Sequence, residues 1–100
     1  MPERNPIIKK IINAKPKTYI IFFGYDCSFS ILALDLLRNS NVFYKGYDIY
    51  QIPGGMAKLL DILSEHIELI GFNINHKTKP IIFYNGKFIG GYAELSEILS

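Results

Sequence analysis

The sequence predicts an α/β domain in which helices flank a mixed, four-stranded sheet. Segments with helical spacing of apolar residues alternate with short apolar runs, in the order α-β-α-β-α-β-β-α. The last two runs are separated by Asn85-Gly86, a dipeptide that is a strong signal for a two-residue β-hairpin. The chain has 100 residues, of which 49% are hydrophobic, so we expect one domain, 1–100, with its own core.

The first part of the chain predicts a helix, a buried strand and a second helix. Isoleucines recur with helical spacing over residues 7–12, after the capping residue Asn5 and after Pro6, which suits a first helical turn. Residues 18–23 form a continuous apolar run, typical of a strand buried on both faces. Residues 27–39 predict a helix. Its expected apolar face consists of Phe29, Leu32, Ala33, Leu36 and Leu37.

The remaining segments complete the sheet. Residues 42–49 predict a second strand, and residues 56–70 predict one long helix. Because a helix joins the first two strands, we expect them to be parallel, with a right-handed crossover. Residues 81–84 and 87–89 predict the antiparallel hairpin, and residues 93–99 predict a final helix.

Composition limits the classes of function. The net charge of +2 is too small to indicate binding to nucleic acid or to a membrane surface. A single cysteine excludes an internal disulfide framework. The first six residues lack the apolar run of a secretory signal, and no segment reaches membrane-spanning length. We therefore expect a reducing, cytoplasmic compartment, in which a free thiol persists.

The one cysteine, Cys27, is a candidate nucleophile. It follows the buried strand where the second helix begins, and the N–H groups and peptide dipoles of a helix start favour the reactive thiolate. The alternative is a buried, inert cysteine. Ser30 lies three residues later on the same helix face, so its hydroxyl is a candidate donor to the thiolate. The alternative for Ser30 is an ordinary first-turn serine.

Four short motifs occur together in a characteristic order. They are Cys27-Ser-Phe-Ser30, Thr78-Lys79-Pro80, Asn85-Gly86 and Gly90-Gly91-Tyr92. In this order the chain, from Thr18 to its end, resembles the glutaredoxin family and its thioredoxin-like fold. The single cysteine resembles the monothiol members of that family, and the active-site sequence is C-S-F-S.

The resemblance implies a binding site for glutathione. It implies a cis peptide bond before Pro80, which lies against the thiol, and it implies that the backbone of Lys79 pairs with the glutathione peptide. The backbone N–H groups that start the last helix are expected to bind a carboxylate. The implied glutathione-binding residues are Thr78, Lys79 and Pro80 in one loop and Gly91, Tyr92 and Ala93 in the other.

Several residues depart from the family pattern. Gly24 stands where a lysine commonly holds the glycine carboxylate of glutathione, and Ala93 stands where Ser, Thr or Asp commonly contacts the γ-glutamyl end. Ser28 replaces the glycine of the common monothiol motif. The charge of Asp26, next to the cysteine, opposes thiolate formation.

Three further side chains are candidates for the site. Lys77 or Lys79 is expected to supply the cation that Gly24 lacks; the alternative is that both are solvated surface lysines. The ring of Tyr25 is expected to wall the site, or else to be an ordinary turn aromatic. His66 and His76 lack partners at ligand spacing, so they are interpreted as helix-surface and loop residues, and no metal site is expected from the chain alone.

Three functions follow from these observations. The first is a glutathione-dependent thiol-disulfide oxidoreductase that acts by a monothiol mechanism on glutathionylated or disulfide-bonded proteins. The second is an iron–sulfur carrier that binds a 2Fe-2S cluster between two chains, with Cys27 as its ligand and glutathione as co-ligand. The third is a non-catalytic interaction module. A monomer is expected unless a cluster bridges two chains, and neither nucleic acid nor a membrane is an expected partner.

Overall fold

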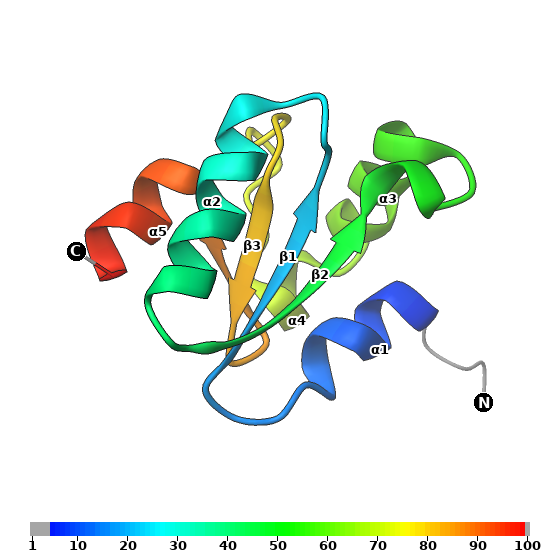
Figure 1. Ribbon diagram of the computed structural model, residues 1–100. Helices are drawn as coiled ribbons and strands as arrows, with labels where there is room; N and C mark the ends of the chain where they lie inside the picture. Colours follow the sequence, from blue (N-terminus) through cyan, green and yellow to red (C-terminus); the bar gives the residue numbers. More distant parts are fainter. Residues whose placement is uncertain (1–4, 100) are drawn as a thin grey trace.

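The computed structural model describes residues 5–99 and shows three layers: helices, sheet, helices (Figure 1). Residues 1–4 and 100 lie outside the described part, and with them most of the stretch considered for a secretory signal. The elements are α1 Pro6–Ile12, β1 Thr18–Phe23, α2 Ser28–Asn39, β2 Phe43–Asp48, the 3-10 turn η1 Ile49–Gln51, α3 Gly55–Ser64, α4 Ile67–Ile70, β3 Ile81–Tyr84, β4 Lys87–Gly90 and α5 Tyr92–Leu99.

The sheet has the strand order β2-β1-β3-β4. β1 pairs parallel with β2, while the β1–β3 and β3–β4 pairs are antiparallel. All six residues of β1 are buried, as expected for a central strand covered on both faces. The predicted mixed sheet and the thioredoxin-like element order are confirmed.

Two apolar clusters, one on each face, hold the layers together. α2 and α5 cover one face, and α1, α3 and α4 cover the other (Figure 1). The buried cluster beneath α2 and α5 consists of Tyr19, Ile21, Phe23, Ala33, Leu37, Ile82 and Leu95. The opposite cluster includes Ile8, Ile11, Ile20, Phe22, Leu59, Leu63, Ile81 and Phe83. Within residues 5–99, no helix is both long enough and apolar enough to cross a membrane.

The predicted cap at Asn5 and the predicted turn at Asn85-Gly86 are confirmed. The Asn5 side chain accepts a hydrogen bond of 2.8 Å from the N–H of Ile7, which caps α1. Asn85 and Gly86 both have positive φ angles, 53° and 78°, as a two-residue type I′ hairpin turn requires. The β3–β4 hairpin is therefore fixed by its own turn.

The prediction of one helix over residues 56–70 is wrong. The helix ends at Ser64, and a separate short helix begins at Ile67. The His66 ring explains the break, because its Nδ1–H donates to the carbonyl of Ile62 at 2.8 Å. The backbone N–H of His66 bonds instead to Leu63, three residues back, so the α-helical pattern stops there.

Two smaller expectations are also corrected. The second strand is Phe43–Asp48, shorter than the predicted 42–49, because Ile49 begins a 3-10 turn that the Asp48 carboxylate caps. On α2, Phe29 is 57% exposed and Leu32 is 45% exposed, although both were expected on the buried face. The buried stripe is centred on Ser30, Ala33 and Leu37, one step around the helix.

Candidate functional site

Cys27 lies at the start of α2, partly exposed to solvent. It is the N-cap residue, and the helix begins one residue after the predicted start. Its N–H donates to the carbonyl of Gly24 at 3.1 Å, and its own carbonyl accepts from Ile31 at 3.2 Å. The backbone of Cys27 is thus held on one side by the Gly24 turn and on the other by the first turn of α2.

The thiol faces the loop that leads into β3. The Lys79–Pro80 peptide bond is cis, as the family resemblance implied. The Cys27 Sγ–H donates to the Lys79 carbonyl at 3.5 Å, although the two residues are 52 positions apart. The fold therefore brings the cysteine and the cis-proline loop together.

Ser30 has a different partner from the one expected. It is fully buried, and its Oγ accepts a hydrogen bond of 3.1 Å from the N–H of Gly24. The hydrogen bond that the described residues show for the thiol goes to Lys79, not to Ser30. Ser30 therefore holds the turn that carries Cys27.

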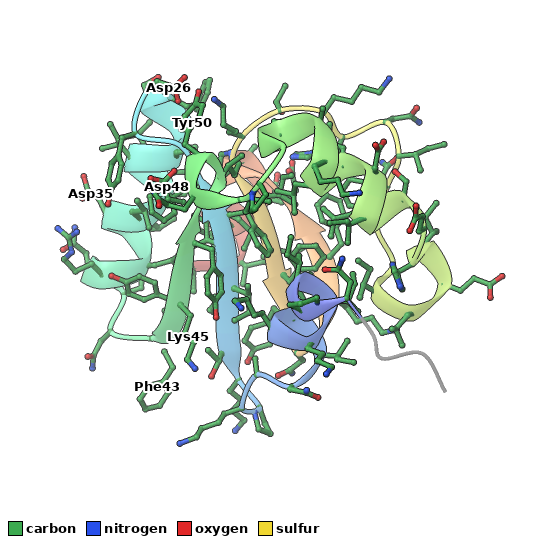
Figure 2. The ribbon with its side chains drawn as sticks, turned by 90° about the vertical axis from the view of Figure 1, so that its right-hand side faces the viewer. Asp26, Asp35, Phe43, Lys45, Asp48 and Tyr50 are labelled. Carbon is green, nitrogen blue, oxygen red and sulfur yellow. The ribbon has the colours of Figure 1, made fainter. Side chains whose placement is uncertain are left out.

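Lys79 belongs to a charged cluster beside the thiol. Its ammonium donates to both Asp26 oxygens, at 3.0 and 3.2 Å, and to the Tyr50 hydroxyl at 3.0 Å. The Tyr50 hydroxyl donates to Asp26 at 2.6 Å, and Figure 2 shows these two residues together at one end of the molecule. The hydrogen bonds from Tyr50 and Lys79 lower the pKa of Asp26 below its ordinary 3.8. Those with Tyr50 and Asp26 raise the pKa of Lys79 above 10.5.

Gly24 leaves the room that this cluster occupies. A Cβ atom at Gly24 would lie 2.7 Å from Asp26 Oδ1, 2.9 Å from Lys79 Cδ and 3.3 Å from Lys79 Nζ. The side chain of Lys79 thus fills the space beside the position where the family commonly carries its lysine.

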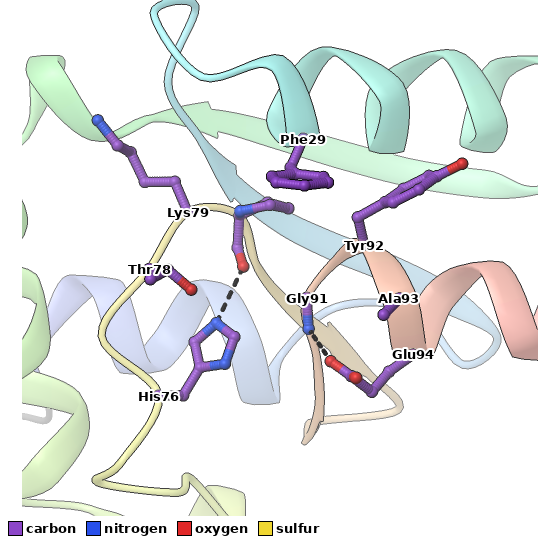
Figure 3. Close-up of a pocket in the computed structure, with 9 residues that line it drawn as sticks. Phe29, His76, Thr78, Lys79, Gly91, Tyr92, Ala93 and Glu94 are labelled. Atoms are coloured by element: carbon purple, nitrogen blue, oxygen red, sulfur yellow. Dashed lines mark hydrogen bonds between the residues drawn. The ribbon is translucent and has the colours of Figure 1, made fainter.

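A cavity of about 210 Å³ opens between the cis-proline loop and the start of α5 (Figure 3). One wall is the cis-proline loop and the other is the start of α5, and Phe29 lies above them with its ring 6.2 Å from that of Tyr92. The lining residues are Phe29, His76, Thr78, Lys79, Pro80, Gly91, Tyr92, Ala93 and Glu94. Six of the predicted binding residues, three on each wall, are brought together here.

Two predicted residues lie elsewhere. Lys77 lines a separate cavity against α3, with Asp61 and Ser64. Tyr25 is 67% exposed, and its ring packs edge-on against Phe23 at 4.9 Å. Neither residue lines the cavity between the cis-proline loop and α5. The structure therefore supports Lys79, and not Lys77, as the cation near Cys27.

A comparison with known proteins finds a relative that matches nearly the whole chain. The chain is 46% identical over 95 residues to a probable glutaredoxin of Acanthamoeba polyphaga mimivirus, covering 95% of this chain and 90% of that protein. The chain belongs to the glutaredoxin family. It is therefore a glutaredoxin-like redox protein with thiol-disulfide oxidoreductase activity. No family model matches the chain.

Solved glutaredoxins share the fold at low sequence identity. The dithiolic glutaredoxin of Trypanosoma brucei brucei is 24% identical, with a TM-score of 0.66 over 98% of this chain and 87% of that one. A buckwheat glutaredoxin–glutathione complex is 22% identical, with a TM-score of 0.64 over 89% of this chain and 72% of that one. These likenesses show the fold of the domain.

Sequence reasoning missed two residues of the glutaredoxin site. The Glu94 carboxylate accepts from the N–H of Gly91 at 2.7 Å (Figure 3). This is one half of a capping box, which the spacing of a glutamate three residues after Gly91 could have indicated. His76 was set aside, yet its Nε2–H donates to the Pro80 carbonyl at 3.1 Å. No sequence signal marked that contact.

Proposed function

We propose that this glutaredoxin reduces glutathione mixed disulfides with Cys27 as its sole redox thiol. The observation that carries the proposal is the partly exposed residue Cys27, whose sulfur lies 3.5 Å from the carbonyl of Lys79, a residue of the cis-proline loop that lines the cavity. The buckwheat protein of the same fold was solved with glutathione, which supports glutathione as the ligand.

The chain's single thiol sets the chemistry. The Cys27 thiolate attacks the glutathione sulfur of a protein–glutathione disulfide, and the protein leaves as a thiolate that takes up a proton. Cys27 is then joined to glutathione by a disulfide bond. A second glutathione thiolate attacks this bond, which releases oxidised glutathione and restores Cys27. Neither step needs a second protein cysteine.

The two walls of the cavity offer complementary groups to glutathione. The backbone of Lys79 is available to the peptide unit, and the N–H groups of Tyr92 and Ala93 at the start of α5 suit a carboxylate. The ammonium of Lys79 lies beside Gly24, the position where the family commonly carries its lysine, and it is paired there with Asp26. A reducing compartment such as the cytoplasm suits this chemistry.

A 2Fe-2S cluster does not fit the residues of one chain. Such a cluster takes four ligands, usually cysteine thiolates, and this chain has one cysteine. Within residues 5–99, no three His, Cys, Asp or Glu side chains come together as a metal site. One chain alone therefore does not supply the ligands of a cluster, and a carrier that binds it between two chains, with Cys27 from each and glutathione as co-ligand, stays the alternative function.

Turnover of a glutathionylated peptide tests the proposal. With glutathione as reductant, we expect the wild type and the control Asp35→Asn, at an exposed position of α2, to release the free peptide, and Cys27→Ser to be inactive. When glutathione is withheld, the second step cannot occur, and mass spectrometry of the wild type should show one glutathionyl group on Cys27. A folded, inactive wild type would indicate an interaction module, and a brown dimer that forms with glutathione would indicate a cluster carrier.

A further inference from the structure

His76 links the two walls of the cavity. It lies in the loop between α4 and β3, partly buried, and its ring points towards the Pro80 carbonyl (Figure 3). The ring also packs edge-on against Phe88 with centroids 5.1 Å apart. Its Cε1 atom lies 3.3 Å from the place where a Cβ on Gly91 would stand. One imidazole therefore contacts the cis-proline loop and the turn before α5.

The hydrogen bond to the Pro80 carbonyl determines which ring nitrogen of His76 carries a proton. A carbonyl oxygen only accepts, so the His76 Nε2 atom, 3.1 Å from Pro80 O, must carry a proton. The Pro80 residue is buried, and losing a donor to a buried carbonyl is costly. His76 thus holds the Pro80 peptide in one orientation.

The orientation of the Pro80 peptide affects the thiol through the neighbouring Lys79–Pro80 peptide unit. The Lys79 carbonyl, which accepts the Cys27 S–H, belongs to the peptide bond just before Pro80. On the other side, the ring lies 3.3 Å from where a Cβ on residue 91 would stand, which is a tight contact, and the N–H of Gly91 is held by Glu94. The distance between the cis-proline loop and the start of α5 therefore depends on the side chain at position 76.

We propose that His76 is a positioning residue that sets the spacing between the cis-proline loop and the start of α5 for binding of a glutathionyl group. This role rests on the proposed function. It acts through Pro80 and Gly91 and involves no contact with the reacting sulfur atoms. The ring's Nε2–H, which donates to Pro80, is the feature that matters, so a side chain with an N–H at similar reach should substitute for it.

Two variants separate the hydrogen bond from simple packing. His76→Gln keeps an amide N–H donor, and His76→Leu has a similar size but no donor. With a glutathionylated peptide as substrate, His76→Leu should raise KM about fivefold, the effect of one neutral hydrogen bond, with kcat nearly unchanged. His76→Gln should stay within about twofold of wild type.

Each outcome has a definite meaning. An unchanged KM in folded His76→Leu, or an equal rise in His76→Gln, overturns the role of His76 while wild-type turnover keeps the proposed function. A wild type without turnover overturns both. If His76→Leu does not fold, Gly91→Ala takes its place, because the added methyl would stand 3.3 Å from the ring, which must then shift by a few tenths of an ångström. An unchanged KM in that variant would also overturn the proposal.

Discussion

The ammonium of Lys79 lies 3.0 Å from the carboxylate of Asp26, so the cation of the cis-proline loop is paired with the anion that precedes the active-site cysteine. Tyr50 bridges both groups, with hydrogen bonds of 2.6 Å to the carboxylate and 3.0 Å from the ammonium. The cluster has no net charge. Each of its two charges therefore cancels much of the other's influence on the neighbouring thiol and on an incoming anionic ligand.

Removing the charge of Asp26 should make Cys27 more reactive. Asp26→Asn deletes the negative charge beside the thiol and leaves the Lys79 ammonium unopposed, which favours the thiolate. We expect iodoacetamide to alkylate the variant about two- to fivefold faster at neutral pH and low salt, and less so at high salt.

Asp35→Asn is the matched control, because Asp35 lies on α2 and pairs with the exposed Arg38 at 3.6 Å. It changes the net charge equally but away from the thiol. Equal alkylation rates in the two variants would contradict a local effect of Asp26.

The same ion pair should make a pH-dependent contribution to stability. The pKa of Asp26 is lowered below 3.8, so its contribution is present above that value and is lost as the pH falls through the lowered pKa. The pKa of Lys79 is raised above 10.5, so its contribution is present below that value and is lost as the pH rises through the raised pKa.

The difference in melting temperature between wild type and Asp26→Asn measures this contribution. It should be constant from about pH 5 to about pH 9 and should shrink towards both extremes. Because Asp26 is exposed and Lys79 is partly exposed, we expect the contribution of the pair to be small and to fall with added salt. A difference that grew at low pH would be incompatible with a paired Asp26.

Elements with local causes could be predicted from the sequence. The apolar run of β1, the cap at Asn5 and the turn at Asn85-Gly86 each depend on a few neighbouring residues, and all three were identified. The pairing of the cysteine with the cis-proline loop was accessible only through the resemblance, because it joins residues 52 positions apart.

Side-chain partnerships across the fold could not be predicted. Tyr50 reaches Asp26 across 24 positions and Lys79 reaches it across 53, and neither spacing leaves a periodic signal. The break at His66 depends on which way one ring points. The sequence therefore predicted a binding role for Lys79 but not its ion pair with Asp26.

Ser30→Ala should destabilise the turn that carries Cys27. The substitution removes the acceptor for the buried N–H of Gly24, and an unsatisfied buried donor costs about 1–3 kcal/mol. Urea unfolding should show this loss, while Ser28→Ala, at an exposed position, should be close to wild type. A large fall in alkylation rate without loss of stability would instead restore the original hypothesis that Ser30 assists the thiolate.

Two leucines on α2 offer a matched test of the layer it covers. Leu37 is fully buried against the sheet, whereas Leu32 is 45% exposed. Leu37→Ala should lower the free energy of unfolding by about 2–5 kcal/mol, because it removes buried methyl groups and leaves a cavity. Leu32→Ala makes the same chemical change on the same helix and should cost less than about 1 kcal/mol. Chemical denaturation of both variants decides: equal losses would mean that Leu32 is also buried, as the helical spacing alone had predicted, and that the stripe through Ser30, Ala33 and Leu37 is misplaced.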